Sequence, residues 1–295
     1  MPHPVRPDAS LRAALQGVRG LLLDLDGVLI LKGAAVPGAA DALAALDREG
    51  FPYLVVTNTS LVSRVTLATW GAAAGFATPA DRFVSALSAS AALARHEFRD
   101  RPLYVICSAD ARSELDGLTA WTGPHADADP GSVAAVILGD SPDELTKENL
   151  DRAFRLVLGG AELIGMHRNP WWLTPAGPTL DAGAFLVGLE WATRRRARIV
   201  GKPSPVLFST AVARLAADLA SRGEPRLRRS ELAMVGDDVT SDIGGGRRAG
   251  LRTVFVRSGK HGDGELAAAA TRRRYPYAPD GVAPSIAEVV SALLA

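Results

Sequence analysis

Short, mainly apolar runs recur along the chain, and each of them ends at a polar or glycine-rich corner. They cover residues 20–24, 53–57, 103–107, 133–138, 232–236 and 252–256. Runs of this length are typical of strands that are buried on both faces, as in a parallel sheet. Alanine-rich amphipathic stretches predict helices at Ala39–Glu49, which stops at Gly50, and at Pro205–Ala220. The alternation of strand and helix predicts an α/β fold with right-handed crossovers.

The spacing of polar strand ends predicts an inserted domain. Asp24 and Thr57 are 33 residues apart, which matches one βα unit. The 145 residues from Thr57 to Lys202 are too many for one crossover, and they contain strand and helix patterns of their own. An insertion between site elements is well placed to exclude water and to select the substrate. We therefore expect a discontinuous core at residues 1–96 and 197–295, with an inserted α/β cap domain at residues 97–196.

Carboxylates follow two of the apolar runs. Asp24 and Asp26 come at the end of the first run, and Asp237, Asp238 and Asp242 come after the fifth. In an open α/β sheet, ligands bind outside the carboxyl ends of the strands. Like charges there repel each other unless a cation neutralises them, and oxygen ligands suit a hard divalent cation, most naturally Mg²⁺. The sequence therefore predicts a Mg²⁺ site if the two strand ends are neighbours.

Two further corners carry groups that suit a phosphate. Thr57 and Asn58 follow another apolar run, and their hydroxyl, amide and backbone N–H groups can bind phosphate oxygens. Lys202 lies just before the helix that begins near Ser204, where its ammonium can point at the same crevice. Each of these short motifs is usually an ordinary turn or helix entry when it stands alone. Their ordered occurrence at strand ends and a helix start is what indicates a catalytic site.

The composition excludes several classes of protein. Hydrophobic residues make up 47% and charged residues 22% of the 295 residues, which is typical of a globular protein and not of a disordered one. The 33 basic and 32 acidic residues give a net charge of +1, so we expect neither a nucleic-acid nor a membrane partner. Cys107 is the one cysteine and allows no internal disulfide, which fits a buried strand in a reducing, cytoplasmic setting. The first residues do not follow the pattern of a signal peptide, and no apolar run reaches the ~18 residues of a membrane span.

Taken together, these motifs resemble those of the haloacid dehalogenase (HAD) superfamily of aspartate-nucleophile phosphatases. Four motifs match in order: Asp24-Leu-Asp26-Gly-Val, Thr57-Asn58, Lys202, and Gly236-Asp237-Asp238 with Asp242. The chain more narrowly resembles subgroup IIA, which includes pyridoxal phosphatase, nitrophenyl phosphatases and the phospholysine/phosphohistidine inorganic pyrophosphate phosphatase-like members. The segments Gly201–Pro205 and Met166–Trp172 carry this narrower resemblance. It implies a Rossmann-like, doubly wound parallel sheet as the core.

The resemblance also implies a mechanism. Asp24 would attack phosphorus and form an aspartyl-phosphate, and Asp26 would act first as a general acid and then as a general base. An aspartate at the second position favours hydrolysis, because related transport ATPases carry a threonine there and keep the phosphoenzyme longer. We therefore expect a phosphatase that acts on a small phosphorylated molecule, either a phosphate monoester or a phosphoanhydride or phosphoramidate.

The same resemblance assigns the ligands of the site. Mg²⁺ would be held by Asp24, by the main-chain carbonyl of Asp26 and by Asp237. Either Asp238 or Asp242 would orient the metal waters, and we favour Asp242. The residues expected to bind phosphate are Thr57, Asn58, Gly27 and Lys202.

Three residues of the insertion are candidates for substrate specificity, namely His167, Trp172 and Asp181. Trp171 and Trp172 stand where the similar proteins tend to carry tyrosines, so the substrate of those proteins does not transfer directly. Packing within the cap is the alternative role of the two tryptophans. The alternative role of Asp181 is to cap a helix at Ala182–Ala192. The resemblance is also compatible with a homodimer formed through the cap.

Other functions fit the sequence less well. A calcium loop that starts at Asp24 would need a glutamate at position 35, which is Ala35. Residues 244–249 fit the G-x-G-x-x-A pattern of a dinucleotide-binding oxidoreductase, but they begin well after a strand instead of in its first turn. A phosphotransferase of the same fold, in which an alcohol replaces water, and a non-catalytic protein of this fold are the remaining alternatives.

Overall fold

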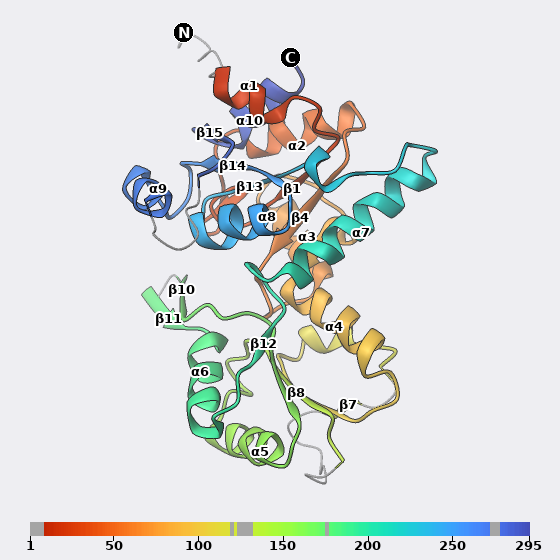
Figure 1. Ribbon diagram of the computed structural model, residues 1–295, viewed down its shortest axis with the longest axis vertical. Helices are drawn as coiled ribbons and strands as arrows, with labels where there is room; N and C mark the ends of the chain where they lie inside the picture. Colours follow the sequence, from red (N-terminus) through yellow and green to blue (C-terminus); the bar gives the residue numbers. More distant parts are fainter. Residues whose placement is uncertain (1–8, 119–120, 123–131, 175–176, 272–277) are drawn as a thin grey trace. The chain divides into compact units, whose positions relative to one another are not determined.

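The computed structural model describes residues 9–118, 121–122, 132–174, 177–271 and 278–295 (Figure 1). The chain divides into two compact units. Unit 1 consists of Met1–Thr57, Ala68–Val84 and Phe208–Ala295, and unit 2 consists of Asn58–Leu67 and Ser85–Leu207. Unit 2 therefore includes the whole of residues 97–196 and extends beyond them on both sides. The assignment of a catalytic core and a specificity cap stays a prediction, because compactness does not identify the role of a unit.

A six-stranded sheet forms the centre of unit 1. Its strand order is β15-β14-β13-β1-β4-β5, and the pairs from β15 to β4 run parallel. The strands are β1 Gly20–Leu23, β4 Tyr53–Thr57, β5 Phe83–Ser85, β13 Leu232–Gly236, β14 Arg252–Val256 and β15 Gly281–Ala283. Nearly all of these residues are buried, which is why the runs lack polar interruptions. The predicted α/β fold with a parallel sheet is confirmed.

Helices flank this sheet and close unit 1. They are α1 Ala9–Leu15, α2 Ala39–Arg48, α3 Arg64–Ala73, α7 Pro205–Ser221, α8 Gly245–Arg248, α9 Asp263–Ala270 and α10 Ile286–Leu293. The first residues of α3 and α7 belong to unit 2. Three shorter helical segments are η1 Ala80–Arg82, η3 Arg229–Glu231 and the π-helix η4 Val239–Gly244, and a small hairpin joins β2 Ile30–Leu31 to β3 Ala34–Ala35.

The helix α2 shows how the sequence pattern becomes structure. It buries Ala39, Ala42, Leu43 and Leu46 on one face, and it packs against α10. The backbone of Gly50 has φ +61°, a left-handed conformation that ends the helix at little steric cost. The predictions of a helix at Ala39–Glu49 and of a second helix, now seen as α7, are confirmed to within one residue at each end.

Unit 2 is built around a second parallel sheet, with the strand order β12-β9-β8-β6-β7. Its strands are β6 Leu103–Ile106, β7 Trp121–Thr122, β8 Ala135–Leu138, β9 Glu162–Gly165 and β12 Arg198–Ile199. The helical segments are α4 Ala86–Glu97, η2 Ala111–Leu115, α5 Lys147–Leu158 and α6 Ala182–Thr193, and an antiparallel hairpin joins β10 Trp171–Thr174 to β11 Gly177–Leu180. Apolar side chains of β6, β8 and β9 form one core with side chains of α5 and α6.

Cys107 follows β6 directly and is fully buried in unit 2. Burial raises the pKa of its thiol to about 11, so the thiol stays protonated at neutral pH. This agrees with the expected role of a small core residue. Among the described residues, no helix combines the length and the apolar character that a membrane span requires.

Candidate active site

Three carboxylates meet at the carboxyl edge of the sheet of unit 1. Each of Asp24, Asp237 and Asp242 offers one oxygen, and these oxygens all lie within 4.8 Å of one another. All three side chains are buried. The condition on which the predicted metal site depends, that the two strand ends are neighbours, is therefore met.

The pairing of β1 with β13 explains how these residues come together. Leu23 pairs with Val235, and the backbone N–H of Asp24 donates to the Val235 carbonyl at 2.9 Å. Asp24 and Asp237 therefore leave neighbouring strands at the same edge. The π-helix η4 then turns the chain back so that the Asp242 side chain lies against Gly236, where any Cβ would clash with it.

Two glycines pack against the carboxylate of Asp237. A Cβ on Gly27, which has φ +82°, would lie 2.5 Å from Asp237 Oδ2. A Cβ on Gly259 would collide with the same carboxylate, whose Oδ2 accepts a hydrogen bond of 2.7 Å from the backbone N–H of Lys260. The hydroxyl of Ser258 donates to the Gly27 carbonyl at 2.6 Å and ties the two glycine turns together. Only glycine at positions 27 and 259 leaves room for the Asp237 carboxylate where it lies.

Asp238 takes a different role from that of its neighbour. Its Oδ1 accepts hydrogen bonds of 2.8 Å from the backbone N–H groups of Thr240 and Ser241, and its Oδ2 lies 2.6 Å from the Lys260 ammonium. Burial alone would raise its pKa, but the charge and hydrogen bond of Lys260, together with the Ser241 and Thr240 N–H groups, outweigh burial and lower the pKa to about 2. Asp238 is therefore an ionised helix cap with its own cation, whereas Asp242 lies in the carboxylate cluster.

The carboxylate cluster fits a hard divalent cation. Three buried carboxylates within 4.8 Å of one another repel strongly unless positive charge lies between them. The ammonium of Lys260 is bound to Asp238, so it does not lie at the centre of the cluster. An all-oxygen donor set is the kind that Mg²⁺ and Ca²⁺ prefer.

The remaining candidate residues of unit 1 lie at the same strand ends. Asp26 is exposed on the turn that follows β1, where it forms an isolated β-bridge with Ile30. Thr57 is the last residue of β4 and is completely buried. Residues 244–249, which fit the dinucleotide pattern, lie within η4, α8 and the turn that follows, so they do not form the first turn after a strand.

Asn58 and Lys202 lie together in unit 2. The side-chain amide of Asn58 donates to the main-chain carbonyl of Lys202 at 2.9 Å and to Asn169 Oδ1 at 3.3 Å. The side chain of Lys202 is only 3% exposed. The two segments that the sequence proposed as phosphate-binding are thus hydrogen-bonded to each other.

The three specificity candidates differ in exposure. His167 and Asp181 are buried, and His167 Nε2 lies 3.4 Å from Asp181 Oδ1. Burial lowers the pKa of His167 to about 4 and raises that of Asp181 to about 6. Asp181 also caps α6 by accepting the backbone N–H of Ala182 at 2.8 Å, as its alternative role required. Trp172 is exposed on β10.

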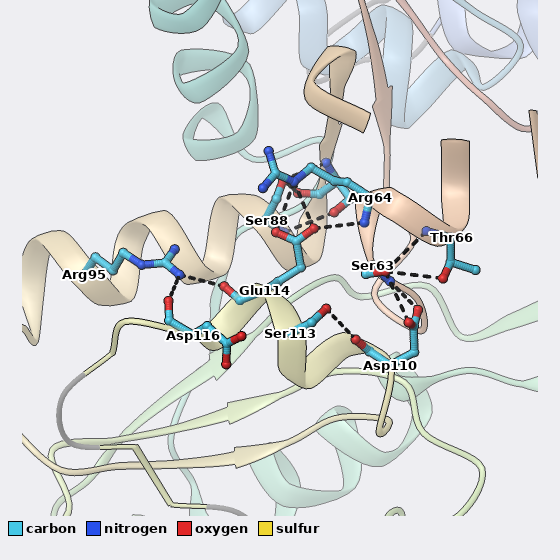
Figure 2. Close-up of polar contacts among 10 residues, drawn as sticks. Ser63, Arg64, Thr66, Ser88, Arg95, Asp110, Ser113, Glu114 and Asp116 are labelled. Carbon is cyan, nitrogen blue, oxygen red and sulfur yellow. Dashed lines mark hydrogen bonds and ion pairs between the residues drawn. The ribbon is translucent and has the colours of Figure 1, made fainter. Parts of the chain in front are cut away.

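Sequence reasoning missed a polar cluster at the start of α3 (Figure 2). Glu114 Oε1 accepts both the backbone N–H and the Nε–H of Arg64 at 2.9 Å. Asp110 Oδ2 accepts the backbone N–H of Ser63 at 2.7 Å, and Ser63 Oγ accepts that of Thr66 at 3.3 Å. Ser63 could have been found as a helix cap, but no sequence signal links it to carboxylates about 50 residues away.

Comparison with known proteins identifies the family. A family model described as haloacid dehalogenase-like hydrolase matches residues 21–119, and a second HAD-hydrolase-like model matches residues 199–289. The chain is 33% identical over 250 residues to haloacid dehalogenase-like hydrolase domain-containing protein 2 of Bos taurus, which covers 84% of this chain and 88% of that protein. It is 30% identical to the phospholysine phosphohistidine inorganic pyrophosphate phosphatase of Homo sapiens, with 95% of this chain and 96% of that protein covered.

The fold is also similar to that of a solved structure. The p-nitrophenyl phosphatase structure from Archaeoglobus fulgidus superimposes with a TM-score of 0.80 at 24% identity, covering 94% of this chain and 99% of that one. The expected resemblance and the expected hydrolase class are both confirmed by these comparisons. The chain belongs to the haloacid dehalogenase-like hydrolase family.

Proposed function

We propose that this hydrolase is a Mg²⁺-dependent phosphatase that cleaves a small phosphate monoester, phosphoanhydride or phosphoramidate through an aspartyl-phosphate on Asp24. The observation that carries the proposal is the meeting of Asp24, Asp237 and Asp242 oxygens within 4.8 Å at the ends of two parallel strands. A nucleophile at such an edge can reach a ligand outside the sheet. Membership of a hydrolase family and similarity to named phosphatases support the same reaction class.

The proposed reaction has two steps on this chain's own residues. An Asp24 oxygen attacks phosphorus, the bond to the leaving oxygen or nitrogen breaks, and Asp26 gives that atom a proton. Asp26 then removes a proton from a water, which attacks phosphorus, releases phosphate and restores the Asp24 carboxylate. Asp26 suits this exchange because it is exposed to water, whereas Asp24 is buried beside the other acids.

The remaining roles concern charge and position. Asp24, Asp237, Asp242 and the Asp26 carbonyl would hold Mg²⁺, which when bound offsets the charge of the phosphate and of the clustered acids. Asn58 and Lys202 would hold phosphate oxygens, and their mutual hydrogen bond supports a common function. Thr57 and Gly27 complete the proposed phosphate-binding set.

The substrate is proposed only as a class. The similarity to a phosphatase named for phospholysine, phosphohistidine and pyrophosphate supports P–N and P–O–P bonds as candidates beside simple esters. Trp172 is the specificity candidate that can meet a substrate directly, since it is exposed on β10. His167 and Asp181 stay candidates that would act from buried positions.

Hydrolysis of p-nitrophenyl phosphate tests this proposal. We expect phosphate release that requires Mg²⁺, is abolished by EDTA and recovers when Mg²⁺ is restored. Asp24→Asn should lose at least about a thousandfold in kcat because it removes the nucleophile. Asp41→Asn, an exposed aspartate on α2, is the matched control and should keep full activity. Activity that survives both Asp24→Asn and EDTA would contradict the assignment.

A further inference from the structure

The segment that follows Thr57 is held in place by unit 2 along its length. Asn58 contacts the Lys202 carbonyl and Asn169, and the Leu61 carbonyl accepts a hydrogen bond from Ser108 Oγ. Between these two points lies Ser60, whose side chain is 1% exposed. The position of the main chain at Asn58 therefore depends on how Ser60, two residues further along, is fixed.

Ser60 Oγ is the meeting point of two elements of unit 2. It accepts the backbone N–H of Asp140, which follows β8, at 2.9 Å. It also lies 2.9 Å from Nε2 of the buried His167. A buried hydroxyl with two short contacts holds its main chain in one place, because losing either contact leaves a polar atom without a partner.

The tautomer of His167 follows from its other nitrogen. The backbone N–H of Asn169 donates to Nδ1 at 3.3 Å, so Nδ1 must be an acceptor. Full burial lowers the pKa of the ring to about 4 and keeps it neutral. In a neutral imidazole the proton then resides on Nε2, and Nε2–H donates to Ser60 Oγ.

This arrangement is not that of a nucleophilic serine. A catalytic histidine would accept the serine proton on a free Nε2 while a carboxylate holds Nδ1–H. Here Nε2 carries the proton, and Asp181 approaches the same Nε2 at 3.4 Å. Ser60 is also almost completely buried, so it offers no surface to a substrate.

The loop that carries His167 holds the segment at two points. His167 binds Ser60, and Asn169 Oδ1 accepts the Asn58 amide at 3.3 Å. We propose that His167 and Ser60 are positioning residues, which fix the main-chain N–H of Asn58 for phosphate binding through the His167–Ser60 hydrogen bond. This inference rests on the proposed function of Asn58. It assigns His167 an effect on the phosphate group that all substrates share, not on the part that distinguishes them.

The test compares variants of the full chain on p-nitrophenyl phosphate and on two chemically different phosphate esters, with inorganic phosphate as the inhibitor. Ser60→Ala and His167→Leu should each raise KM for every ester, and Ki for inorganic phosphate, by roughly fivefold to tenfold, which corresponds to one hydrogen bond. The kcat should change less. His167→Gln keeps an N–H that can reach Ser60 and should recover most of the affinity.

A double variant and a matched control sharpen the result. Ser60→Ala combined with His167→Leu should raise KM by less than the product of the two single effects, because both variants remove the same His167–Ser60 hydrogen bond. Ser90→Ala, which changes an equally buried serine on α4, should leave KM and Ki unchanged. Thermal unfolding checks that each variant folds. If His167→Leu does not fold, Ser60→Ala alone tests the positioning role.

The outcomes separate the two proposals. A wild-type protein without Mg²⁺-dependent activity overturns the proposed function and the inference that rests on it. An active wild type whose KM and Ki do not change in Ser60→Ala overturns the positioning role alone. Losses in His167→Leu that differ strongly between esters would assign His167 to specificity and would also overturn it.

Discussion

At the scale of single residues, the sequence predicted those side chains whose positions follow from strand ends. Asp24 and Asp237 lie where buried runs stop, and parallel pairing brings those ends together. The choice between Asp238 and Asp242 was not decidable from spacing, because it depends on the π-helix and on the Lys260 ammonium that binds Asp238. Ser60 carried no signal at all, since a serine after a strand is common and its partner His167 is 107 residues away.

The buried carboxyl of Asp181 gives a pH-dependent prediction at this scale. Burial raises its pKa from 3.8 to about 6, although the Ala182 N–H partly opposes this shift. The folded chain thus holds this proton more tightly than the unfolded chain, so the stability that Asp181 contributes is present below pH 3.8 and is lost as the pH rises through about 6. Asp181→Asn, which can still cap α6, should be more stable than wild type at pH 7 by about 1–3 kcal/mol.

Urea unfolding at three pH values checks this prediction. The advantage of Asp181→Asn should shrink through pH 5.5 and be nearly absent only below pH 3.8, the ordinary value of the unfolded carboxyl. Subtracting the wild-type free energy of unfolding from that of the variant at each pH cancels the contributions of the other titrating groups. A stability difference that stays constant across the series would mean that the carboxyl of Asp181 has an ordinary pKa.

At the scale of elements, local patterns predicted the central strands and the amphipathic helices. They did not predict the hairpin of β10 and β11, because two adjacent tryptophans after a proline follow neither a strand nor a helix period. The start of α3 was also hidden. The backbone N–H of Ser63, just before α3, is bound by Asp110, and that of Arg64, the first residue of α3, is bound by Glu114 of η2 (Figure 2). Only the tertiary structure creates these contacts.

This capping from another element predicts that Glu114 stabilises unit 2. The carboxylate accepts two N–H groups of Arg64 and is itself almost buried, with its side chain 8% exposed. Glu114→Ala should lower the free energy of unfolding by roughly 1–3 kcal/mol, because it leaves the guanidinium and a helix N–H without their acceptor. Chemical denaturation measures the loss. Asp116→Ala is the control, since Asp116 is exposed and receives Arg95 through its main-chain carbonyl; equal losses in both variants would argue against the capping role.

At the scale of the whole molecule, the distance between motifs predicts a core and an inserted cap, and this assignment stays a prediction. The second unit of the structure includes Asn58–Leu67, which the sequence pattern assigns to the core. The reason is physical, because these residues follow a core strand in sequence but bond to the insertion in space. The sequence also left the oligomeric state open. A homodimer through the cap, with which the resemblance is compatible, stays a prediction, and the exposed apolar side chains of unit 2 indicate which surface would form it.

Several large apolar side chains are exposed on β10, β11 and α6 of unit 2. Trp191 is 72% and Trp171 57% exposed, and they are joined by Trp172, Leu180 and Val187. Val187 and Trp191 lie four residues apart on one face of α6, and other α6 residues line an apolar groove with Leu150 and Phe154 of α5. Large exposed apolar side chains of this number are unusual on a monomer, and a second copy can cover those of α6 through the same patch in a two-fold arrangement.

Trp191→Glu tests this form of the homodimer. A buried charge repeated on both sides of a two-fold interface is costly, so the variant should elute as a monomer while the wild type elutes at twice the mass of one chain. Size-exclusion chromatography with light scattering reads this directly. Trp70→Glu changes an exposed tryptophan on α3 that lies in unit 1, and it should leave the dimer intact. A wild type that is already monomeric at high concentration, or a dimer that Trp191→Glu does not weaken, would remove this patch from consideration as the interface.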